Sequence, residues 1–493
     1  MTEEELQEKI RNIQKLKYES QTLELKAAHD GCPKRLYDTL SGFSNQDGGG
    51  MILFGIDECK DYAAVGVYDA QDLQKKINEQ CQQMEPAIRP VLTVTEVDGK
   101  IFVAAEIPAL DAAERPCYYR GKGRLKGSYV RVGDSDETMT EYEIYSYEAF
   151  RKKYQDEVRP AERVSLSSLD QNKLNEYLRR LRIGKPNLSQ LSDAQIQELM
   201  NIVHDGRAAL YTVLLFGLYP QAYYPQLCVL ATVVPGTRVG DVGAEGERFL
   251  DNERIEGDIP QILERSLQFV RRNIKTKTIV NERDGRREDR TEYPMTAVRE
   301  AVLNALIHRD YSIHTEGMPI RIQLFDDRME IRSPGGIYGR ITVDQLGKVQ
   351  PDTRNPKLAS ALETLEITEN RYSGIPMMRI ETERFGLPPV RLEDTRGMFI
   401  VTFYKQTEPD RTANDCGADT RAEELLAFCE QPRSKKEIGE FLGIGSLGYV
   451  MQQYIKPLLE SGRLCRTIPD QPRSHRQKYV RSTLHFRESK RWQ

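Results

Sequence analysis

The sequence predicts an α+β protein of several domains. Its 493 residues exceed what one ordinary hydrophobic core accommodates, so we expect two to four domains. Strand and helix patterns are mixed along the chain: residues 51–56 form an apolar run typical of a buried strand, whereas residues 299–312 repeat apolar side chains at helical spacing. A polar stretch with Pro and Gly at 406–420 is typical of a linker.

Composition narrows the class of protein. The 71 Lys and Arg residues almost balance the 75 Asp and Glu residues, so only local basic patches can indicate a nucleic-acid partner. The acidic N-terminus lacks the apolar region of a secretory signal, and the apolar stretch 208–219 is shorter than the roughly 20 residues of a membrane-spanning helix. The eight cysteines include no CxxC pair. We therefore expect a cytoplasmic protein with reduced thiols and no zinc site.

Changes of pattern along the chain predict five segments. They are an α+β domain at 1–150, a polar helical connector at 151–205, a mixed α/β domain at 206–405, the linker at 406–420 and a small separate unit at 421–493.

The first domain carries an acidic pattern that allows two interpretations. On a strand over 21–26, Glu24 and Lys26 share one face while the leucines between them share the other. Carboxylates beside a lysine can hold a divalent metal against a phosphate, whereas the alternative is a pair of solvated strand charges. Three glycines at 48–50 require a turn before the strand at 51–56.

The motifs ES…LELK…LSGFSNQDGGGMILFGID and GSYVRVGDS follow one another between Glu19 and about Val132. In that order they resemble the Schlafen AlbA-like (AlbA_2) domain, which implies nucleic-acid binding by the first domain. Some Schlafen relatives are nucleases that use two glutamates and an aspartate, and Glu19, Glu24 and Asp57 match those positions. Bacterial members resemble binding proteins instead, so a divalent-metal-dependent nuclease is the alternative to the expected binding role.

The segment from Tyr118 to Val132 is dense in basic and aromatic residues, and we interpret it as a basic hairpin. Basic side chains contact phosphates and aromatic rings stack on bases, whereas a solvated hairpin face is the alternative. The candidate nucleic-acid-binding residues in the first domain are Lys26, Arg120, Lys122, Arg124, Lys126 and Arg131.

The helical pattern at 299–312 places Glu300, Asn304 and His308 four residues apart, on one face. A carboxylate next to an amide oxygen suits a Mg²⁺–nucleotide site, because the carboxylate can orient water and the amide can bind the metal. A helix with one polar face and no ligand is the structural alternative.

The sequence REAVLNALIHRDYS in this helix resembles the N-box of GHKL ATP-binding domains, in the branch labelled as the C-terminal part of RecG-like helicases. FDDRMEIRSPGGI, TRNPKLASAL and ENRYSGIPMMR resemble later motifs of that branch. The resemblance implies ATP and Mg²⁺ as ligands, Glu300 as the water-orienting base of any hydrolysis and Asn304 as the Mg²⁺ ligand. It implies further ATP-binding residues at His308, Ser333, Gly335, Gly336, Arg354, Asn355, Ser373 and Gly374. The chain lacks a GxxxxGK[ST] loop, so no helicase activity is expected.

Two positions depart from the GHKL pattern. Ser333 stands where these proteins use an aspartate for the adenine amine, and Ser373-Gly374 replaces a Gly-x-Gly. A hydroxyl is a weaker acceptor than a carboxylate, and only glycine lets a backbone approach phosphate freely. We therefore expect nucleotide binding with at most weak hydrolysis.

The C-terminal unit shows the pattern of a winged helix-turn-helix. Helices are predicted at 422–428, 434–443 and 446–461, followed by two strands at 464–469 and 477–480 that would form the wing. A winged helix that contacts proteins is the alternative. The candidate DNA-contacting residues are Ser446, Tyr449 and Gln452 of the recognition helix and Arg473, Arg476 and Lys478 of the wing.

The three domains together predict a DNA- or RNA-binding and ATP-binding regulator of transcription. We expect a homodimer, because relatives of both large domains commonly self-associate. The alternatives are the nuclease described above and a scaffold or defence protein whose ATP site is vestigial.

Overall fold

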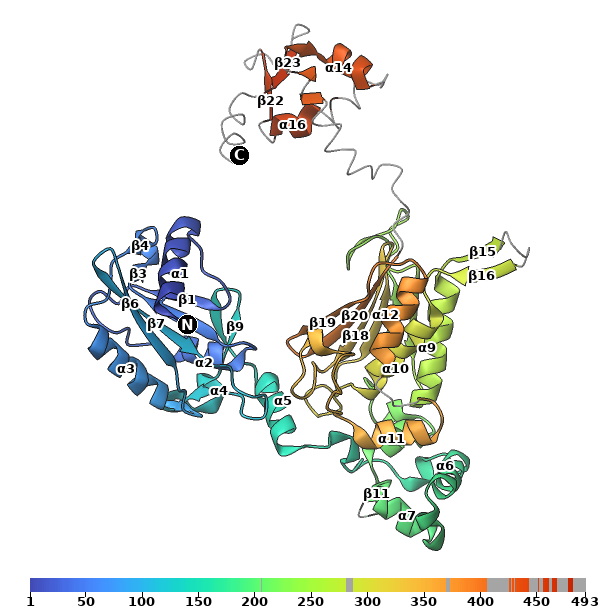
Figure 1. The fold of residues 1–493 in the computed structure, drawn as a ribbon. Helices are drawn as coiled ribbons and strands as arrows, with labels where there is room; N and C mark the ends of the chain where they lie inside the picture. The colour runs from blue at the N-terminus through green and yellow to red at the C-terminus, as the bar shows by residue number, and fades with distance from the viewer. Residues whose placement is uncertain are drawn as a thin grey trace. The chain divides into compact units, whose positions relative to one another are not determined.

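The computed structural model describes residues 1–204, 206–280, 287–368 and 373–405, and parts of 425–481. The chain divides into two compact units, Met1–Gln406 and Thr407–Gln493. Helices alternate with several separate sheets along the chain (Figure 1), which confirms the α+β fold class.

The N-terminal part of the first unit is built on a four-stranded sheet with the order β1-β2-β7-β6. The strands are β1 (Leu23–Lys26), β2 (Gly50–Phe54), β6 (Val91–Val97) and β7 (Lys100–Ile107), and the helices are α1 (Glu3–Leu16), α2 (Tyr37–Asn45) and α3 (Ala70–Gln82). β1 is parallel to β2, and the other pairs are antiparallel.

Both faces of this sheet are covered, as the continuous apolar run at 51–56 predicts. Met51 and Leu53 pack with residues of α1 in one apolar cluster, whereas Ile52 and Phe54 pack with residues of α2 and α3 in another. The glycine turn before β2 is confirmed: Gly48 and Gly49 both have positive φ, and a Cβ on Gly49 would overlap the backbone of Ile107.

The basic hairpin predicted at 118–132 is wrong in its arms, because the two ends of the segment are joined by an isolated antiparallel bridge between Tyr118 and Ser128 rather than by a ladder of paired strands. β8 (Tyr118–Tyr119) is followed by two short helical turns, η2 (Arg120–Lys122) and α4 (Gly123–Gly127), and β9 (Tyr129–Val132) pairs instead with β10 (Ser135–Thr138). The glycines of RGKGRLKG explain the difference. A Cβ on Gly127 would lie 2.6 Å from the Tyr119 carbonyl oxygen, so the chain folds back on itself more tightly than a hairpin arm.

The second part of this unit contains a mixed sheet with the order β14-β13-β17-β18-β20-β19, against which α9, α10 and α12 lie (Figure 1). The strands are β13 (Val229–Val233), β14 (Asp251–Ile255), β17 (Ile320–Leu324), β18 (Arg328–Pro334), β19 (Arg391–Thr395) and β20 (Met398–Tyr404). The helices are α9 (Ile259–Asn273), α10 (Met295–Ile307), α11 (Pro356–Thr364) and α12 (Gly374–Arg384).

Residues 151–205 are more than a connector, because they contribute to the core of the second part. The segment contains α6 (Gln171–Gly184) and α7 (Asp193–Leu199); α5 (Glu141–Lys152) ends in its first two residues, and α8 (Leu210–Phe216) follows it. Leu174 and Tyr177 of α6 belong to the same apolar cluster as α10 and the mixed sheet. The buried Glu157 carboxylate accepts the N–H groups of Lys357 (2.8 Å) and Leu358 (2.7 Å) at the start of α11.

Smaller strand pairs complete the described part of the first unit. They are β3 (Ile56–Asp57) with β4 (Ala63–Ala64), β5 (Met84–Glu85) with β8, β11 (Val203–His204) with β12 (Arg207–Ala208), and β15 (Thr276–Val280) with β16 (Arg287–Thr291). In the ranges given above, no helix is long and apolar enough to cross a membrane.

The second unit has a small sheet with the order β21-β23-β22 and the helices α14 (Lys435–Leu442) and α16 (Lys456–Glu460). β22 (Leu464–Arg466) pairs antiparallel with β23 (Lys478–Arg481), which confirms the two predicted strands, and β21 is Arg433–Ser434. Ser434 and Glu437 form the capping box at the start of α14. The predicted contact residues Ser446, Tyr449, Gln452, Arg473 and Arg476 lie outside the described residues.

Candidate nucleotide and nucleic-acid sites

A cavity of about 830 Å³ lies in the second part of the first unit, within the size range of small-molecule sites. Its wall is formed by α10, the start of α12, strands β18 and β20, and the loop that follows β18. The apolar side chains Ala301, Ile331, Met378, Phe399 and Val401 make up much of the wall.

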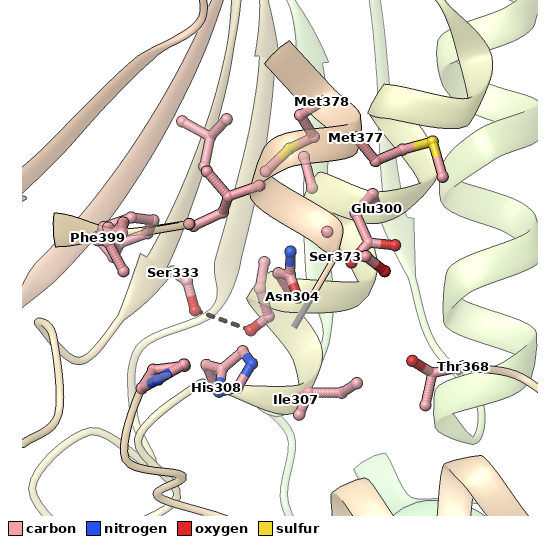
Figure 2. Close-up of a pocket in the computed structure, with 18 of the residues that line it drawn as sticks. Glu300, Asn304, Ile307, His308, Ser333, Thr368, Ser373, Met377, Met378 and Phe399 are labelled. Carbon is pink, nitrogen blue, oxygen red and sulfur yellow. Dashed lines mark hydrogen bonds between the residues drawn. The ribbon is translucent and has the colours of Figure 1, made fainter. Parts of the chain in front are cut away.

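The polar face of α10 opens on this cavity. Glu300, Asn304 and His308 all line it, and Figure 2 shows their side chains on the same side of the helix. Most other residues of α10 are apolar and buried, including Ala297 and Val302. The shared face predicted from the four-residue spacing is confirmed, because the apolar positions fix which side of the helix faces the core.

His308 follows the last turn of α10, and its side chain is exposed toward the cavity that it lines. The surrounding protein atoms, and secondly the charge of Arg354, lower its pKa to about 4. The imidazole is therefore neutral near pH 7 and can exchange hydrogen bonds with a ligand, but it contributes no positive charge toward a phosphate.

Ser333 is positioned as a hydrogen-bond acceptor. Its hydroxyl donates to the Ala305 carbonyl oxygen at 2.9 Å (Figure 2), so its only proton is used within the protein. The oxygen lone pairs remain, and Ser333 lines the cavity. Like the aspartate of GHKL proteins, this hydroxyl can accept a hydrogen bond from an amine, but the bond is weaker.

Arg354 and Asn355, which the resemblance implies as ATP-binding residues, are engaged by the protein itself. The Asn355 amide donates to the carbonyl oxygens of Ile307 and Arg309, both at 2.7 Å. Arg354 lies in the cavity wall, but its guanidinium pairs with Asp310 at 2.7 Å. These side chains hold the end of α10 and the cavity wall in place.

Gly335 and Gly336, which the resemblance also implies as ATP-binding residues, lie where a side chain would not fit. Gly335 has a φ of +102°, and a Cβ there would lie 2.7 Å from the Asp310 Cβ. A Cβ on Gly336 would lie 2.5 Å from the Asp394 carboxylate. Both glycines line the cavity, and Asp394 also accepts the N–H of Ile337 at 2.8 Å.

The N-terminus of α12 reaches the cavity at the other end. Ser373, Gly374 and Ile375 line it, and a Cβ on Gly374 would overlap the Glu300 carboxylate. Unpaired N–H groups and the helix dipole make a helix N-terminus a favourable place for an anion such as a phosphate. The cavity thus combines a helix N-terminus, an amide and a carboxylate at one end with an apolar wall.

The three acidic residues predicted as nuclease candidates in the N-terminal part are each engaged by a donor. The Glu24 carboxylate pairs with Arg131 at 2.7 Å and with Lys26, Asp57 pairs with Lys60, and Glu19 accepts the Leu25 N–H. Burial raises the pKa of Glu19 to about 7, against the opposing effect of its backbone hydrogen bond. Across the part of the chain that the structure describes, no group of three His, Cys, Asp or Glu side chains is arranged to hold a metal.

The predicted basic residues divide into buried and exposed ones. The Arg131 side chain is 1% exposed, between Glu24 and Asp136, and Arg124 pairs with Glu148. Arg120, Lys122 and Lys126 remain exposed. Among the basic residues predicted in the first domain, these three offer an exposed charge to a phosphate, although Arg120 also donates to the Gln82 carbonyl oxygen and lies 3.9 Å from the Glu85 carboxylate.

Sequence reasoning missed Tyr37, which joins the exposed basic residues to an aromatic group. Its ring stacks on Tyr119 with 4.4 Å between centroids, and Lys122 Nζ lies 4.7 Å from its centroid. Lys122 also donates to the Tyr129 hydroxyl at 3.0 Å. Tyr37 is about 80 positions from its partners, so no local pattern could reveal the contact.

Family models match three segments of the chain. Residues 19–140 match "Schlafen, AlbA_2", residues 317–403 match "Putative ATP-dependent DNA helicase recG C-terminal", and residues 421–482 match "Filamentation induced by cAMP protein Fic-like, C-terminal domain". Helix α10, with Glu300 and Asn304, precedes the second matched segment. The first two matches suggest nucleic-acid binding and ATP binding.

Among solved structures, the DIP2311 protein from Corynebacterium diphtheriae is 18% identical over 96% of this chain and 94% of its own, with a TM-score of 0.38. The N-terminal domain of a RecG-related protein from Nitrosomonas europaea is 28% identical over 27% of this chain and 90% of its own, with a TM-score of 0.22. Both TM-scores are too low to support an inference, and no curated protein matches the chain. The first two family matches show that the chain carries an AlbA_2 domain of the Schlafen kind followed by an ATPase-type domain of the RecG C-terminal kind.

Proposed function

We propose that this protein is a nucleic-acid-binding regulator whose ATPase-type domain binds Mg²⁺-ATP. The observation that carries the proposal is the cavity beside α10, in which Glu300, Asn304 and the start of α12 lie together. This pairing of polar groups with an apolar wall matches the two chemical halves of a nucleotide.

Each part of the cavity has a role in this proposal. The Asn304 amide oxygen binds Mg²⁺, and the N–H groups at the start of α12 bind phosphate oxygens. The apolar wall packs on the base, and Ser333 accepts from its amino group. Glu300 is placed to orient a water molecule, so slow hydrolysis is consistent with the site.

Nucleic acid is proposed to bind the N-terminal part through its exposed cations. Arg120, Lys122 and Lys126 are close in sequence and exposed, and Lys122 lies against two tyrosine rings. Phosphates would contact the cations, while neighbouring rings offer faces for bases.

We further propose that the target is DNA, that the protein acts as a cytoplasmic homodimer, and that it regulates transcription. The C-terminal segment supports a DNA target: from Arg433 on, 13 residues are basic and 5 are acidic. Its predicted winged helix would supply the sequence-specific contacts.

The proposal is tested by fluorescence anisotropy with labelled single- and double-stranded oligonucleotides, with and without Mg²⁺-ATP. We expect salt-dependent binding that is weakened when Arg120, Lys122 and Lys126 are all changed to alanine, and an affinity that shifts with ATP. Binding that ignores ATP, together with no ATP binding, would favour the scaffold alternative with a vestigial site. Cleavage of the oligonucleotide with Mn²⁺ would favour the nuclease.

A further inference from the structure

We propose that Tyr142 of α5, which lies outside the ATPase-type domain, is a positioning residue of the nucleotide cavity, and that it links nucleotide binding to the N-terminal domain. The inference rests on the proposed nucleotide site and adds to it the route by which that site is regulated. The family matches assign no role to Tyr142, since residues 141–316 lie between the first two matched segments.

The first observation is a chain of hydrogen bonds from α5 to the cavity wall. The Tyr142 hydroxyl donates to Asp310 Oδ2 at 2.8 Å, and the same oxygen pairs with Arg354 Nη1 at 2.7 Å. Arg354 Nη2 in turn donates to the Gly336 carbonyl oxygen at 3.1 Å. Arg354 and Gly336 both line the cavity, so Tyr142 of α5 is connected to the cavity wall through one intervening side chain, that of Asp310.

The backbone around this chain leaves little freedom. Gly335 donates its N–H to the Gly397 carbonyl oxygen at 2.7 Å, and a Cβ on Gly397 would lie 2.6 Å from Tyr142 Cε1. The Tyr142 ring therefore packs on the turn that holds the Gly335 backbone. A displacement of the cavity wall at Gly335 is transmitted directly to the position of this ring.

A second set of contacts joins the same turn to the N-terminal domain. Arg396 pairs with Glu143 of α5 at 2.8 Å and with Glu137 of β10 at 2.6 Å. β10 pairs with β9, which contains Arg131. The turn at 396–397 is thus tied both to the cavity wall and to the sheet segment that precedes α5.

The loop after β18, which forms part of the cavity wall, also contacts α5. Phe150 meets Tyr338, which lines the cavity, edge to face with 5.3 Å between centroids. Arg340 of the same loop pairs with Asp111 of the N-terminal domain at 3.1 Å. The loop after β18 is therefore held at several points by groups that do not belong to the ATPase-type domain.

The hydroxyl of Tyr142 matters because the ion pair that it contacts, Asp310 with Arg354, is buried. Burial alone would raise the pKa of Asp310, but Arg354, the Ser312 N–H and Tyr142 hold it below its ordinary value. Asp310 is thus ionised and nearly enclosed, so a lost donor is not readily replaced by water. Because coupling between two sites is reciprocal, a nucleotide that fixes Arg354 and Gly336 must also favour one position of α5.

The test compares Tyr142→Phe with Tyr147→Phe in the full chain. Tyr147 is on the same helix but interacts with Arg115 of the N-terminal domain, so it is a matched control. Calorimetry gives the Kd for Mg²⁺-ATP, and amide hydrogen exchange over residues 135–152 reports α5 and β10 with and without the nucleotide. Thermal unfolding checks that both variants are folded.

We expect Tyr142→Phe to raise the Kd about fivefold and to abolish the nucleotide-dependent change in exchange at 135–152, whereas Tyr147→Phe retains both wild-type values. Arg396→Gln, at a partly exposed position outside the cavity wall, should weaken the change in exchange and raise the Kd by a smaller factor, about twofold. A merely structural role for Tyr142 would alter the unfolding temperature without altering the response to nucleotide.

Three results separate the claims. If the wild type binds Mg²⁺-ATP and Tyr142→Phe keeps the wild-type Kd and exchange response, the link is overturned and the proposed function stands. If the wild type binds Mg²⁺-ATP with no change at 135–152, the link is likewise overturned. If the wild type binds no nucleotide, the proposed nucleotide site fails and this inference fails with it.

Discussion

The Glu300 carboxylate of α10 and the Gly374 backbone of α12 lie so close together that a Cβ on residue 374 would overlap Glu300 Oε1. This contact brings the only carboxylate of the α10 polar face next to the N-terminus of α12. The glycine is needed at this position for steric reasons, because its φ is in the ordinary helical region.

Gly374→Ala is expected to displace the Glu300 carboxylate without unfolding the domain. The overlapping atom is the far end of a flexible side chain, so the free energy of unfolding should change by less than about 1 kcal/mol. Any ATP hydrolysis should fall at least about tenfold, because the water-orienting group is moved. Phosphate release and thermal unfolding measure the two effects, and unchanged hydrolysis in the variant would remove Glu300 from its proposed role.

Arg131→Ala and Lys126→Ala should have opposite effects, although both residues were predicted to bind nucleic acid. Arg131 is buried between Glu24 and Asp136, so its removal takes the cation away from the buried Asp136 carboxylate, leaves Glu24 with Lys26 alone, and should destabilise the fold by about 3 kcal/mol. Lys126 is exposed, so its removal should leave stability unchanged and weaken oligonucleotide binding. Denaturant unfolding and anisotropy distinguish the two. A stable Arg131→Ala protein with reduced binding would contradict this interpretation.

Asn355→Ala should destabilise the protein by about 2 kcal/mol, because two buried carbonyl oxygens at the end of α10 lose their donor. Exposed Asn172→Ala on α6 is the control, and denaturant unfolding is the measurement. If Asn355 instead binds phosphate, the variant would keep its stability and lose nucleotide affinity.

Glu157 should make stability depend on pH. Burial raises its pKa to about 7, although the N–H groups of Leu358 and Lys357 oppose the shift. The folded state therefore retains a proton that the unfolded chain releases near pH 4.3, so stability should fall as pH rises from about 4.5 to 7, by about 3 kcal/mol in total.

Denaturant unfolding across that pH range measures the contribution of Glu157. In Glu157→Gln this part of the pH dependence should disappear, whereas Glu198→Gln, at an exposed position on α7, should keep it. The same slope in both variants would show that Glu157 does not titrate in this range.

The parts of the site that the sequence could predict are those encoded by local spacing. Glu300, Asn304 and His308 share a helix face because four residues make about one turn, and the apolar positions of α10 orient that face. The glycines at 48–50 similarly dictate the turn before β2.

The remaining features depend on partners distant in sequence. Arg131 was predicted as a surface cation because its partner Glu24 is 107 residues away, and Tyr142 is 168 residues from Asp310. The segment 118–132 places basic residues at every second position from 120 to 126, as an amphipathic strand does, but close contacts at its glycines favour two short helical turns instead. The preferences of neighbouring residues for helix or strand do not reveal contacts between residues that are distant in sequence.

The most direct test of the central claim is a calorimetric titration of the purified chain with Mg²⁺-ATP, comparing the wild type with Asn304→Ala. We predict a single-site binding curve for the wild type and none for the variant, with equal unfolding temperatures. The absence of binding in the wild type, or equal affinity in Asn304→Ala, would contradict a nucleotide site in the cavity beside α10.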